Sequence, residues 1–531
     1  MNNPKVYLKP NAFLEPLFNQ WYAWSYLISP ATSAMYMANL QLKILQSFIA
    51  TPQVHVSAMK NPANLGGPFI SYDASKVGEI KDLMEKTITK QSHILDFANA
   101  VKTLDKKLKE EAKGYSLEPL YKDIPEILKG YVELVYDLNN QPSIRFIEGL
   151  LYKSKYYNQS SQSITLAINE DDERPFVFST PRLVEDSLLH LNIPFKHKGI
   201  DELFRMKTTP QPLAYISECL EIAAKDEDKF AFLFTEETPR MPSTYAGEDV
   251  RIRYFGHASI LIETKDTSIL FDPVISYQHG NGIDRFTYAD LPPVIDYVIL
   301  THNHQDHVVC EPLLQLRHRI KNLIVPKNSG GNLADPSLKM LMQNIGFPQV
   351  RELDEMESIE IADGFIMGVP FFGEHTDLNI RSKLCFWVKI KSQSILCLID
   401  TKNIEDEIYT HIHEVVGDVD ALFIGMECDG SPMTWVYGPL LTKPLPRDMD
   451  QSRRYDCSNY DLAIGIIKRF NPQQVYVYAM GQEPWLTFLT SKKYVEQSYP
   501  ILESDKLIAD CHIRGIAAER LFGKKEIFLK S

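Results

Sequence analysis

A heptapeptide at residues 301–307, T-H-N-H-Q-D-H, constrains the fold of this chain more than any other stretch. It follows a short apolar run that is typical of a buried strand, so its polar side chains leave the carboxyl end of that strand. His302 and His304 are two residues apart, and an extended backbone would place both side chains on one side. Asp306 and His307 follow after a turn and can serve a second position nearby. Imidazoles and carboxylates are good ligands for zinc, iron or manganese, so the heptapeptide predicts a dinuclear metal site.

The length and the charge of the chain limit which classes of protein it can belong to. With 531 residues it is too long for one ordinary hydrophobic core, which predicts two domains or one large domain with extensions. The formal net charge of −13 is spread along the chain, which argues against a protein that follows the phosphates of a nucleic acid. The most apolar early stretch, residues 31–50, contains Asn39, Gln41, Lys43 and Gln46 and is too polar to span a membrane. We therefore expect neither nucleic acid nor a membrane as a partner.

The seven cysteines are scattered along the sequence and include no C-x-x-C pair. Several lie in apolar runs typical of strands, as buried free thiols do, so a reducing compartment is the simplest interpretation. We therefore expect a cytoplasmic protein.

Residues 1–245 are predicted to form an N-terminal domain of mixed helix and strand. Apolar residues recur at helical spacing over 37–48 and again over 94–108. The polar, proline-containing stretch 236–247 is the expected linker. The catalytic domain is expected to occupy residues 246–531.

Closely spaced apolar segments follow the linker and predict a strand-rich second half. Helices are expected between several of these strands, for example around 311–319 and 460–470. Two strand-rich halves with helices outside indicate an α/β fold of the αβ/βα sandwich type. The predicted strands cover residues 251–255, 259–263, 268–272, 297–300, 322–325, 365–369, 385–390, 395–399, 421–426 and 475–479.

Five motifs follow one another along this second half. They are Gly256-His-Ala-Ser, Phe271-Asp-Pro, the heptapeptide, Glu374-His375 and Ile399-Asp400-Thr401. Their order resembles that of the metallo-β-lactamase superfamily, and the resemblance covers about residues 248–510. It implies that the heptapeptide supplies both metal sites and that Asp400, at a strand end, bridges the two metals.

Two departures from the ordinary hydrolases of that superfamily point towards iron. Those enzymes have a histidine after a late strand, whereas here the strand 475–479 leads into Met480-Gly-Gln-Glu-Pro-Trp485 without one. They also use only a histidine where this chain has Glu374 directly before His375. Three histidines with three carboxylates are a more anionic and oxygen-rich set than the hydrolytic one, which favours iron over a zinc pair.

These features resemble the diiron β-hydroxylases of non-ribosomal peptide biosynthesis, the chloramphenicol-pathway β-hydroxylase family, which also carry an N-terminal domain of about this size. The resemblance implies a dinuclear non-haem iron monooxygenase that uses dioxygen and an external electron donor. The implied substrate is an aminoacyl group, hydroxylated at its β-carbon while tethered as a phosphopantetheine thioester to a carrier domain of a non-ribosomal peptide synthetase. Which amino acid this is stays open.

Further partners are implied by the same resemblance. No predicted strand is followed by G-x-G-x-x-G, so the chain has no flavin fingerprint and the electrons are expected from a separate reductase. The N-terminal domain would provide the contacts of a homodimer or the docking surface for the carrier domain.

The family implies a ligand set for each iron. Glu374 and Asp400 are also the residues expected to be catalytic. One iron would be held by His302, His304 and Glu374, and the other by Asp306 and His307, with Asp400 bridging.

Three neighbouring residues have less certain roles. His375 is the rival of Glu374, and because adjacent residues on a strand face opposite ways, we do not expect both to bind. Glu427 follows a predicted strand and could either touch the substrate or make structural hydrogen bonds. His257 is expected to support the ligands rather than to be one.

Other functions fit the heptapeptide as well. The main alternative is a dizinc or mixed-metal hydrolase acting on a thioester, lactone or phosphoester, with a bridging hydroxide as nucleophile. A flavodiiron oxygen reductase would have a glutamate where His304 stands, and a non-catalytic scaffold would have lost ligands that this chain keeps.

Overall fold

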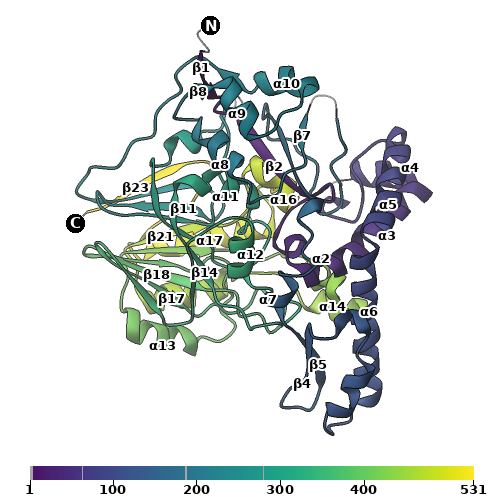
Figure 1. Cartoon of the computed structure of the whole chain (residues 1–531). Helices are drawn as coiled ribbons and strands as arrows, with labels where there is room; N and C mark the ends of the chain where they lie inside the picture. Colours follow the sequence, from purple (N-terminus) through teal and green to yellow (C-terminus); the bar gives the residue numbers. More distant parts are fainter. Residues whose placement is uncertain (1–3, 62–63, 186–187, 279, 281, 531) are drawn as a thin grey trace.

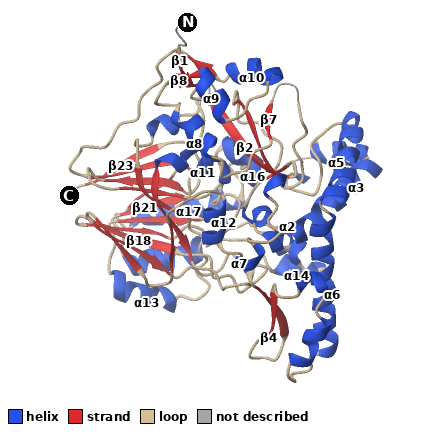
Figure 2. Ribbon diagram, in the orientation of Figure 1, coloured by secondary structure: helices blue, strands red, loops and turns tan. Residues whose placement is uncertain are grey.

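Two seven-stranded sheets face each other in the second half of the chain, with helices on both outer faces (Figures 1 and 2). The computed structural model describes residues 4–61, 64–185, 188–278, 280 and 282–530. The fold is the predicted αβ/βα sandwich, preceded by a mixed N-terminal region. All the strands predicted after the linker are present, with ends that differ by a few residues.

The first sheet has the strand order β15-β14-β13-β12-β11-β10-β23. Its strands β10 to β12 are antiparallel neighbours, whereas β12 to β15 run parallel, so the carboxyl ends of β12, β13 and β14 lie at the same edge. The strands are β10 (Val250–Gly256), β11 (Ser259–Glu263), β12 (Ser268–Phe271), β13 (Ile295–Ile299), β14 (Ile320–Pro326), β15 (Val350–Leu353) and β23 (Lys525–Leu529).

The second sheet repeats this plan, with the order β16-β17-β18-β19-β20-β21-β22. Its parallel part runs from β19 to β22. The strands are β16 (Ser358–Ile361), β17 (Gly364–Val369), β18 (Cys385–Ile390), β19 (Gln393–Cys397), β20 (Ala421–Gly425), β21 (Gln474–Tyr478) and β22 (Ala517–Arg520).

Both faces of each sheet are covered, which explains the unbroken apolar runs in the sequence. In β12, Ile269 and Phe271 enter the core between the sheets, while Leu270 points to the outer face. The outer face of the second sheet packs against α13 (Glu407–Val416), α15 (Tyr460–Phe470) and α17 (Tyr499–Ile513). The outer face of the first sheet packs against α11 (Cys310–Leu316), α12 (Leu338–Asn344) and the N-terminal region, all within one hydrophobic core.

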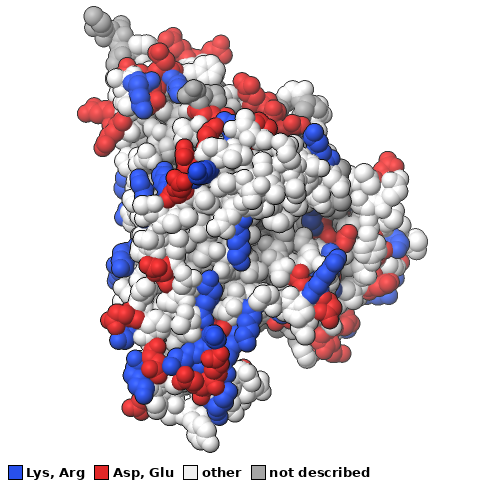
Figure 3. Space-filling view, turned by 90° about the vertical axis from the view of Figure 1, so that its right-hand side faces the viewer, with Lys and Arg blue, Asp and Glu red and all other residues white. Residues whose placement is uncertain are grey.

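The N-terminal region combines a four-stranded sheet with a column of helices, which stands on the right of Figure 1. The sheet has the order β3-β2-β6-β7, made of β3 (Trp21–Tyr22), β2 (Ala12–Phe18), β6 (Gln162–Ile168) and β7 (Leu189–Leu191). The column contains α3 (Leu42–Ala50), α5 (Val77–Lys90) and α6 (Ser92–Glu111), and acidic and basic side chains are mixed on the face that it presents (Figure 3). The helices predicted over 37–48 and 94–108 lie here, the first beginning with a π-helical turn (Met37–Gln41).

Buried ion pairs join the N-terminal region to the helix that follows the heptapeptide. One guanidinium nitrogen of Arg174 lies 2.8 Å from Glu15 of β2 and 2.8 Å from Glu311 of α11. Tyr22 and Tyr277 also donate hydrogen bonds to Glu311, at 3.3 Å and 3.1 Å. Since buried charges need such partners, this network fixes α11 against the N-terminal region.

The structure bears on two further expectations. All seven cysteines are free thiols, and four of them (Cys310, Cys385, Cys397 and Cys511) are fully buried. Within the described ranges, each helix is too short or too polar to cross a membrane.

Candidate metal centre

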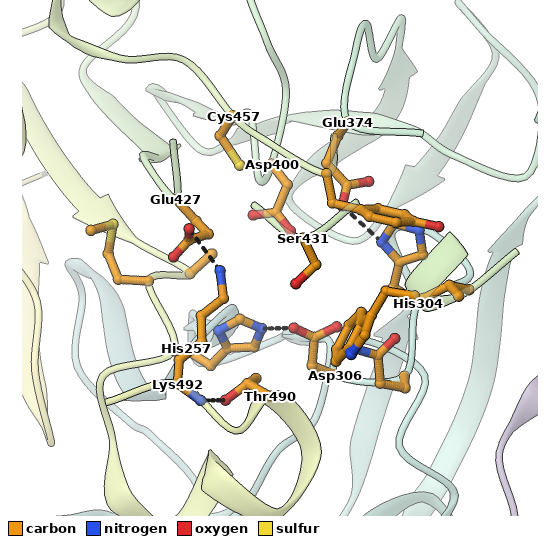
Figure 4. A pocket seen from close by; sticks show the side chains of 17 residues that line it. His257, His304, Asp306, Glu374, Asp400, Glu427, Ser431, Cys457, Thr490 and Lys492 are labelled. Atoms are coloured by element: carbon orange, nitrogen blue, oxygen red, sulfur yellow. Dashed lines mark hydrogen bonds and ion pairs between the residues drawn. The ribbon is translucent and has the colours of Figure 1, made fainter. Parts of the chain in front are cut away.

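The predicted ligands come together at the carboxyl ends of strands from both sheets. Figure 4 shows His304, Asp306, Glu374 and Asp400 around one pocket. The heptapeptide 301–307 follows β13 of the first sheet, and Asp400 follows β19 of the second. Glu374 lies in the loop after β17. Parallel strands that end at one edge therefore deliver these side chains to one place.

His302, His304 and Glu374 form one group of possible ligands. Their donor atoms lie within 4.8 Å of one another, and all three residues are buried. Nδ1 of His304 is 3.0 Å from Oε1 of Glu374 (Figure 4). Nδ1 of His302 is 3.0 Å from the hydroxyl of Thr301, whereas its Nε2 is buried and has no hydrogen-bond partner among the described residues. A metal ion would satisfy that nitrogen.

His302, His307 and Asp400 form a second group that overlaps the first. Nδ1 of His307 is 2.8 Å from Asp272, and its Nε2 is 2.9 Å from Asp400. A carboxylate only accepts hydrogen bonds, so Nδ1 of His307 donates its proton to Asp272. Burial lowers the pKa of His307, but Asp400 and Asp272 outweigh burial and raise that pKa well above its ordinary value, so a metal ion at Nε2 would displace a proton. Asp400 belongs to this group alone, while His302 links it to the first group.

Asp306 belongs to a third group, with His257 and His307. Nε2 of His257 lies 3.3 Å from a carboxylate oxygen of Asp306. His257 has φ of +52° and directly follows Gly256, where a β-carbon would meet the ring of Trp485 at 2.8 Å. This tight, left-handed turn after β10 brings His257 against the heptapeptide, closer to the ligands than its sequence position indicated.

Burial and neighbouring charges shift the pKa values of other histidines and of a carboxylate in the site. Burial holds the pKa of His302 and of His375 well below the ordinary value, so both imidazoles are neutral. Burial raises the pKa of Asp306, but His307 and His257 outweigh it, and that pKa lies below its usual range. Neutral imidazole and ionised carboxylate are the forms that coordinate metal ions.

The loop that carries Glu374 and His375 corrects one step of the sequence argument. We expected opposite orientations because of strand geometry, but φ at Glu374 is +58° and the residues are not in a strand. Nδ1 of His375 lies 3.0 Å from Oε2 of Glu374, and its ring stacks on that of His304 with centroids 4.4 Å apart. His375 is in none of the three ligand groups found in the described part of the chain, which supports Glu374 as the ligand.

Glu427 follows β20 and lines a pocket together with His304, Asp306, Glu374 and Asp400. Its Oε1 lies 2.6 Å from Nζ of Lys492 (Figure 4), and its Oε2 is buried without a hydrogen-bond partner in the described chain. Burial raises the pKa of Glu427, and Lys492 opposes this. The side chain can therefore hold an ion pair and still offer one oxygen to another donor.

Several residues of the site were not found from the sequence. Asp272 stood in a recognised motif at a strand end, but its role in orienting His307 was not assigned. No motif or spacing in the sequence around Lys492 indicated that this residue lies in the site. Tyr437 places its hydroxyl 3.5 Å from Nε2 of His304, and Tyr455 stacks on Tyr437 with centroids 5.7 Å apart. Both tyrosines lie more than a hundred positions from the heptapeptide, and no sequence pattern predicted their contact with His304.

The fold and the site together define a dinuclear metalloenzyme of the metallo-β-lactamase type. A model of the beta-lactamase superfamily domain matches residues 251–426, and a model described as the diiron non-heme beta-hydroxylase N-terminal domain matches residues 7–239.

Known proteins identify the family. The chain is 36% identical, over 98% of its length and 99% of the relative's, to the 4-amino-L-phenylalanyl-[CmlP-peptidyl-carrier-protein] 3-hydroxylase of Streptomyces venezuelae. The crystal structure of CmlA, a diiron beta-hydroxylase from that organism, covers 99% of this chain and 100% of its own, with a TM-score of 0.92 and 34% identity. The hydrolase YtkL of Bacillus subtilis is 39% identical, but over only 11% of this chain and 24% of its own. This chain belongs to the diiron β-hydroxylase family, and its fold, hydroxylase chemistry and dinuclear iron centre using dioxygen follow from that membership.

Proposed function

We propose that the protein hydroxylates the β-carbon of an aminoacyl group held as a phosphopantetheine thioester on a carrier domain of a non-ribosomal peptide synthetase. The relative in Streptomyces venezuelae is named as a hydroxylase of such a carrier-bound amino acid. The observation that most supports the proposal is the contact between Glu374 and His304, since a carboxylate takes the place where hydrolases use a histidine. An oxygen-rich ligand set suits iron and dioxygen chemistry.

The proposed ligands follow the three groups of side chains. His302, His304 and Glu374 would hold one iron, while Asp306 and His307 would hold the other, with Asp400 bridging. The buried, unpartnered Nε2 of His302 and Oδ1 of Asp400 fit this assignment, as does the position of Nε2 of His307, 2.9 Å from the other oxygen of Asp400. The iron pair supplies the activation of dioxygen, and the protein sets its ligand charge and orientation.

Residues around the centre prepare the site for the substrate. Asp272 keeps His307 in the tautomer that binds metal. Glu427 offers its free oxygen to the α-ammonium group of the aminoacyl thioester, while Lys492 holds its other oxygen. The buried rings of Tyr437 and Tyr455 exclude water beside His304. The β-carbon, one bond from the α-carbon, would then be presented to the metal side of the pocket.

The proposal also includes the proteins with which this chain would interact. The family relationship supports a carrier domain as the bound partner. Electrons would come from a separate reductase, and the N-terminal region, residues 1–245, would dock the carrier domain or form a homodimer. The free, buried thiols suit a cytoplasmic location.

Reconstitution with iron tests the function. The protein is loaded with ferrous iron without oxygen, reduced, and exposed to oxygen with a series of aminoacyl-loaded carrier domains. We expect one acyl group to gain the mass of one oxygen atom. Hydrolysis of the thioester without any mass gain across the whole series would instead favour the dizinc hydrolase.

A further inference from the structure

A second cavity lies between the N-terminal region and the end of α11, next to α8 (Lys198–Arg205). Figure 1 shows where α8 and α11 lie. Its volume is about 310 Å³, which is within the range of small-molecule sites. The end of α8, the residues after it and the proline-containing stretch 239–242 line the cavity, together with the end of α11 and the residues after that helix. The cavity shares no lining residue with the metal centre.

Three basic side chains line this cavity without an acidic partner. Among the described residues, Nζ of Lys207 donates hydrogen bonds only to neutral oxygens, the carbonyl of Pro10 at 3.2 Å and the side chain of Gln315 at 3.3 Å. Nε of Arg319 and Nδ1 of His318 are buried and have no hydrogen-bond partner in the described chain. The other guanidinium nitrogens of Arg319 donate to the backbone carbonyls of Tyr288, Leu291 and Pro292.

The nearby carboxylates form ion pairs with other arginines. Asp290 pairs with Arg240 at 2.8 Å, and Glu311 pairs with Arg174 at 2.8 Å. Among the described residues, no carboxylate forms an ion pair with Lys207, His318 or Arg319, whereas the neighbouring Arg317 pairs with Asp201. Burying a cation without an anionic partner costs free energy, so a bound anion would stabilise this cluster.

The pKa values reflect the same shortage of negative charge. Burial and the charge of Arg319 lower the pKa of Lys207 to about 7, against a weaker opposing effect of Glu311. Burial and the same arginine lower the pKa of His318 to about 3.

Apolar groups form the rest of the lining. Nζ of Lys207 lies 4.4 Å from the ring centroid of Tyr288 and 5.4 Å from that of Phe204. Pro239 and Pro242 add aliphatic surface. A ligand with a charged head and a compact apolar body would therefore meet complementary groups on both sides.

We propose that this cavity binds a small organic anion, with a phosphate, sulfonate or carboxylate head at Lys207 and Arg319 and an apolar body against Tyr288 and Phe204. The site is independent of the aminoacyl pocket. It lies at the end of α11, whose first residue, Cys310, follows His307 by three positions. A bound anion would therefore stabilise α11, the helix that follows the metal-binding heptapeptide.

Benzenesulfonate is a suitable probe, because its charge is constant between pH 6 and pH 9. Titration calorimetry on the full-length protein at pH 6 should show binding of benzenesulfonate, and weaker binding of inorganic sulfate and of neutral benzyl alcohol. The melting temperature should rise with benzenesulfonate concentration, since the ligand binds the folded state. Benzyl alcohol binding as tightly as benzenesulfonate would overturn the proposal.

Variants locate the site. Lys207→Met and Arg319→Gln should each lower the affinity for benzenesulfonate about tenfold or more, because a charged hydrogen-bonding group is lost. Lys207→Arg should retain binding, which separates a loss of charge from a loss of fold. Lys81→Met, on the exposed face of α5, is the matched control and should bind like the wild type. Unchanged affinity in both cavity variants would show that the anion binds elsewhere and refute the assignment.

The pH dependence gives an independent readout. The titratable and charged groups that face Lys207 are Tyr277, Tyr288, Glu311, His318 and Arg319, and among them Glu311 is the anion. The pKa of His318, about 3, lies below the pH range of the experiment. An anion favours the protonated amine, so affinity should fall as the pH rises from 6 to 9, with proton uptake at pH 8. Lys207→Met should flatten this dependence. A wild-type affinity that does not change over this range would count against Lys207 as the contact.

Discussion

Nδ1 of His307 lies 2.8 Å from the buried carboxylate of Asp272, which also accepts hydrogen bonds from the backbone N–H and the hydroxyl of Thr301. One carboxylate thus fixes the start of the heptapeptide and the tautomer of its last histidine. Asp272 follows β12 and the heptapeptide follows β13, so the parallel pairing of these strands creates the contact.

Asp272→Asn should weaken iron binding roughly 10- to 100-fold, as is usual when a group that orients a ligand is lost. The amide keeps the size of the side chain but removes its charge and can turn a donor towards His307. Iron per chain after dialysis against a graded chelator measures the effect. Asp505→Asn, at an exposed position, is the control, and equal iron retention by both variants would contradict the role.

Glu374→His should shift the bound metal from iron towards zinc and abolish hydroxylation, because it recreates the ligand type of the hydrolases. Metal analysis after growth with both metals gives the ratio. His375→Ala is the comparison, since this histidine stacks on His304 but is in none of the ligand groups. It should keep more iron than Glu374→Ala, and the reverse order would make His375 the ligand.

Much of the fold was predictable because its signals are local. The strands of the sandwich are buried on both faces, so they read as unbroken apolar runs, and the turns between them are short and polar. His302, His304, Asp306 and His307 occupy one short loop, and Asp400 ends an apolar run. Such residues are recognisable without knowledge of the tertiary structure.

The rest of the site depends on contacts between distant segments. Tyr437 reaches His304 across a sequence separation of 133 residues, and Lys492 meets Glu427 from a loop with no pattern of its own. The relation of Glu374 to His375 depends on a left-handed residue, which strand geometry predicted wrongly. The second cavity arises only where the N-terminal region meets α11.

Glu427→Gln should weaken binding of the aminoacyl-loaded carrier roughly tenfold while leaving iron content unchanged. The amide can no longer form a charged hydrogen bond with the α-ammonium group, and such bonds contribute about 1.5–3 kcal/mol. The dissociation constant for loaded carrier and the iron content are measured on the same preparation. Binding of the unloaded carrier is the control, and an equal loss for both forms would place Glu427 outside the aminoacyl pocket.

Arg174→Met should destabilise the protein by about 3–5 kcal/mol, because Glu311 loses its buried arginine partner while Glu15 keeps Arg182. Chemical denaturation at pH 7 measures the free energy of unfolding. Arg145→Met removes an exposed arginine paired with Glu133 and should cost less than about 1 kcal/mol. Similar losses in the two variants would mean that the buried network does not hold the N-terminal region to α11.

The acid stability of the protein should depend on Glu15. Burial raises the pKa of this carboxyl, but Arg182 and Arg174 outweigh burial, so its pKa in the folded protein is lower than in the unfolded chain. Ionised Glu15 therefore contributes stability above its unfolded pKa of about 4.3, and the contribution is lost as the pH falls below that value. Glu15→Gln should melt at a lower temperature than the wild type at pH 7, and the difference should narrow steadily between pH 5 and pH 3.5. A difference in melting temperature that stays constant over this range would show that Glu15 acts through packing and not through its charge.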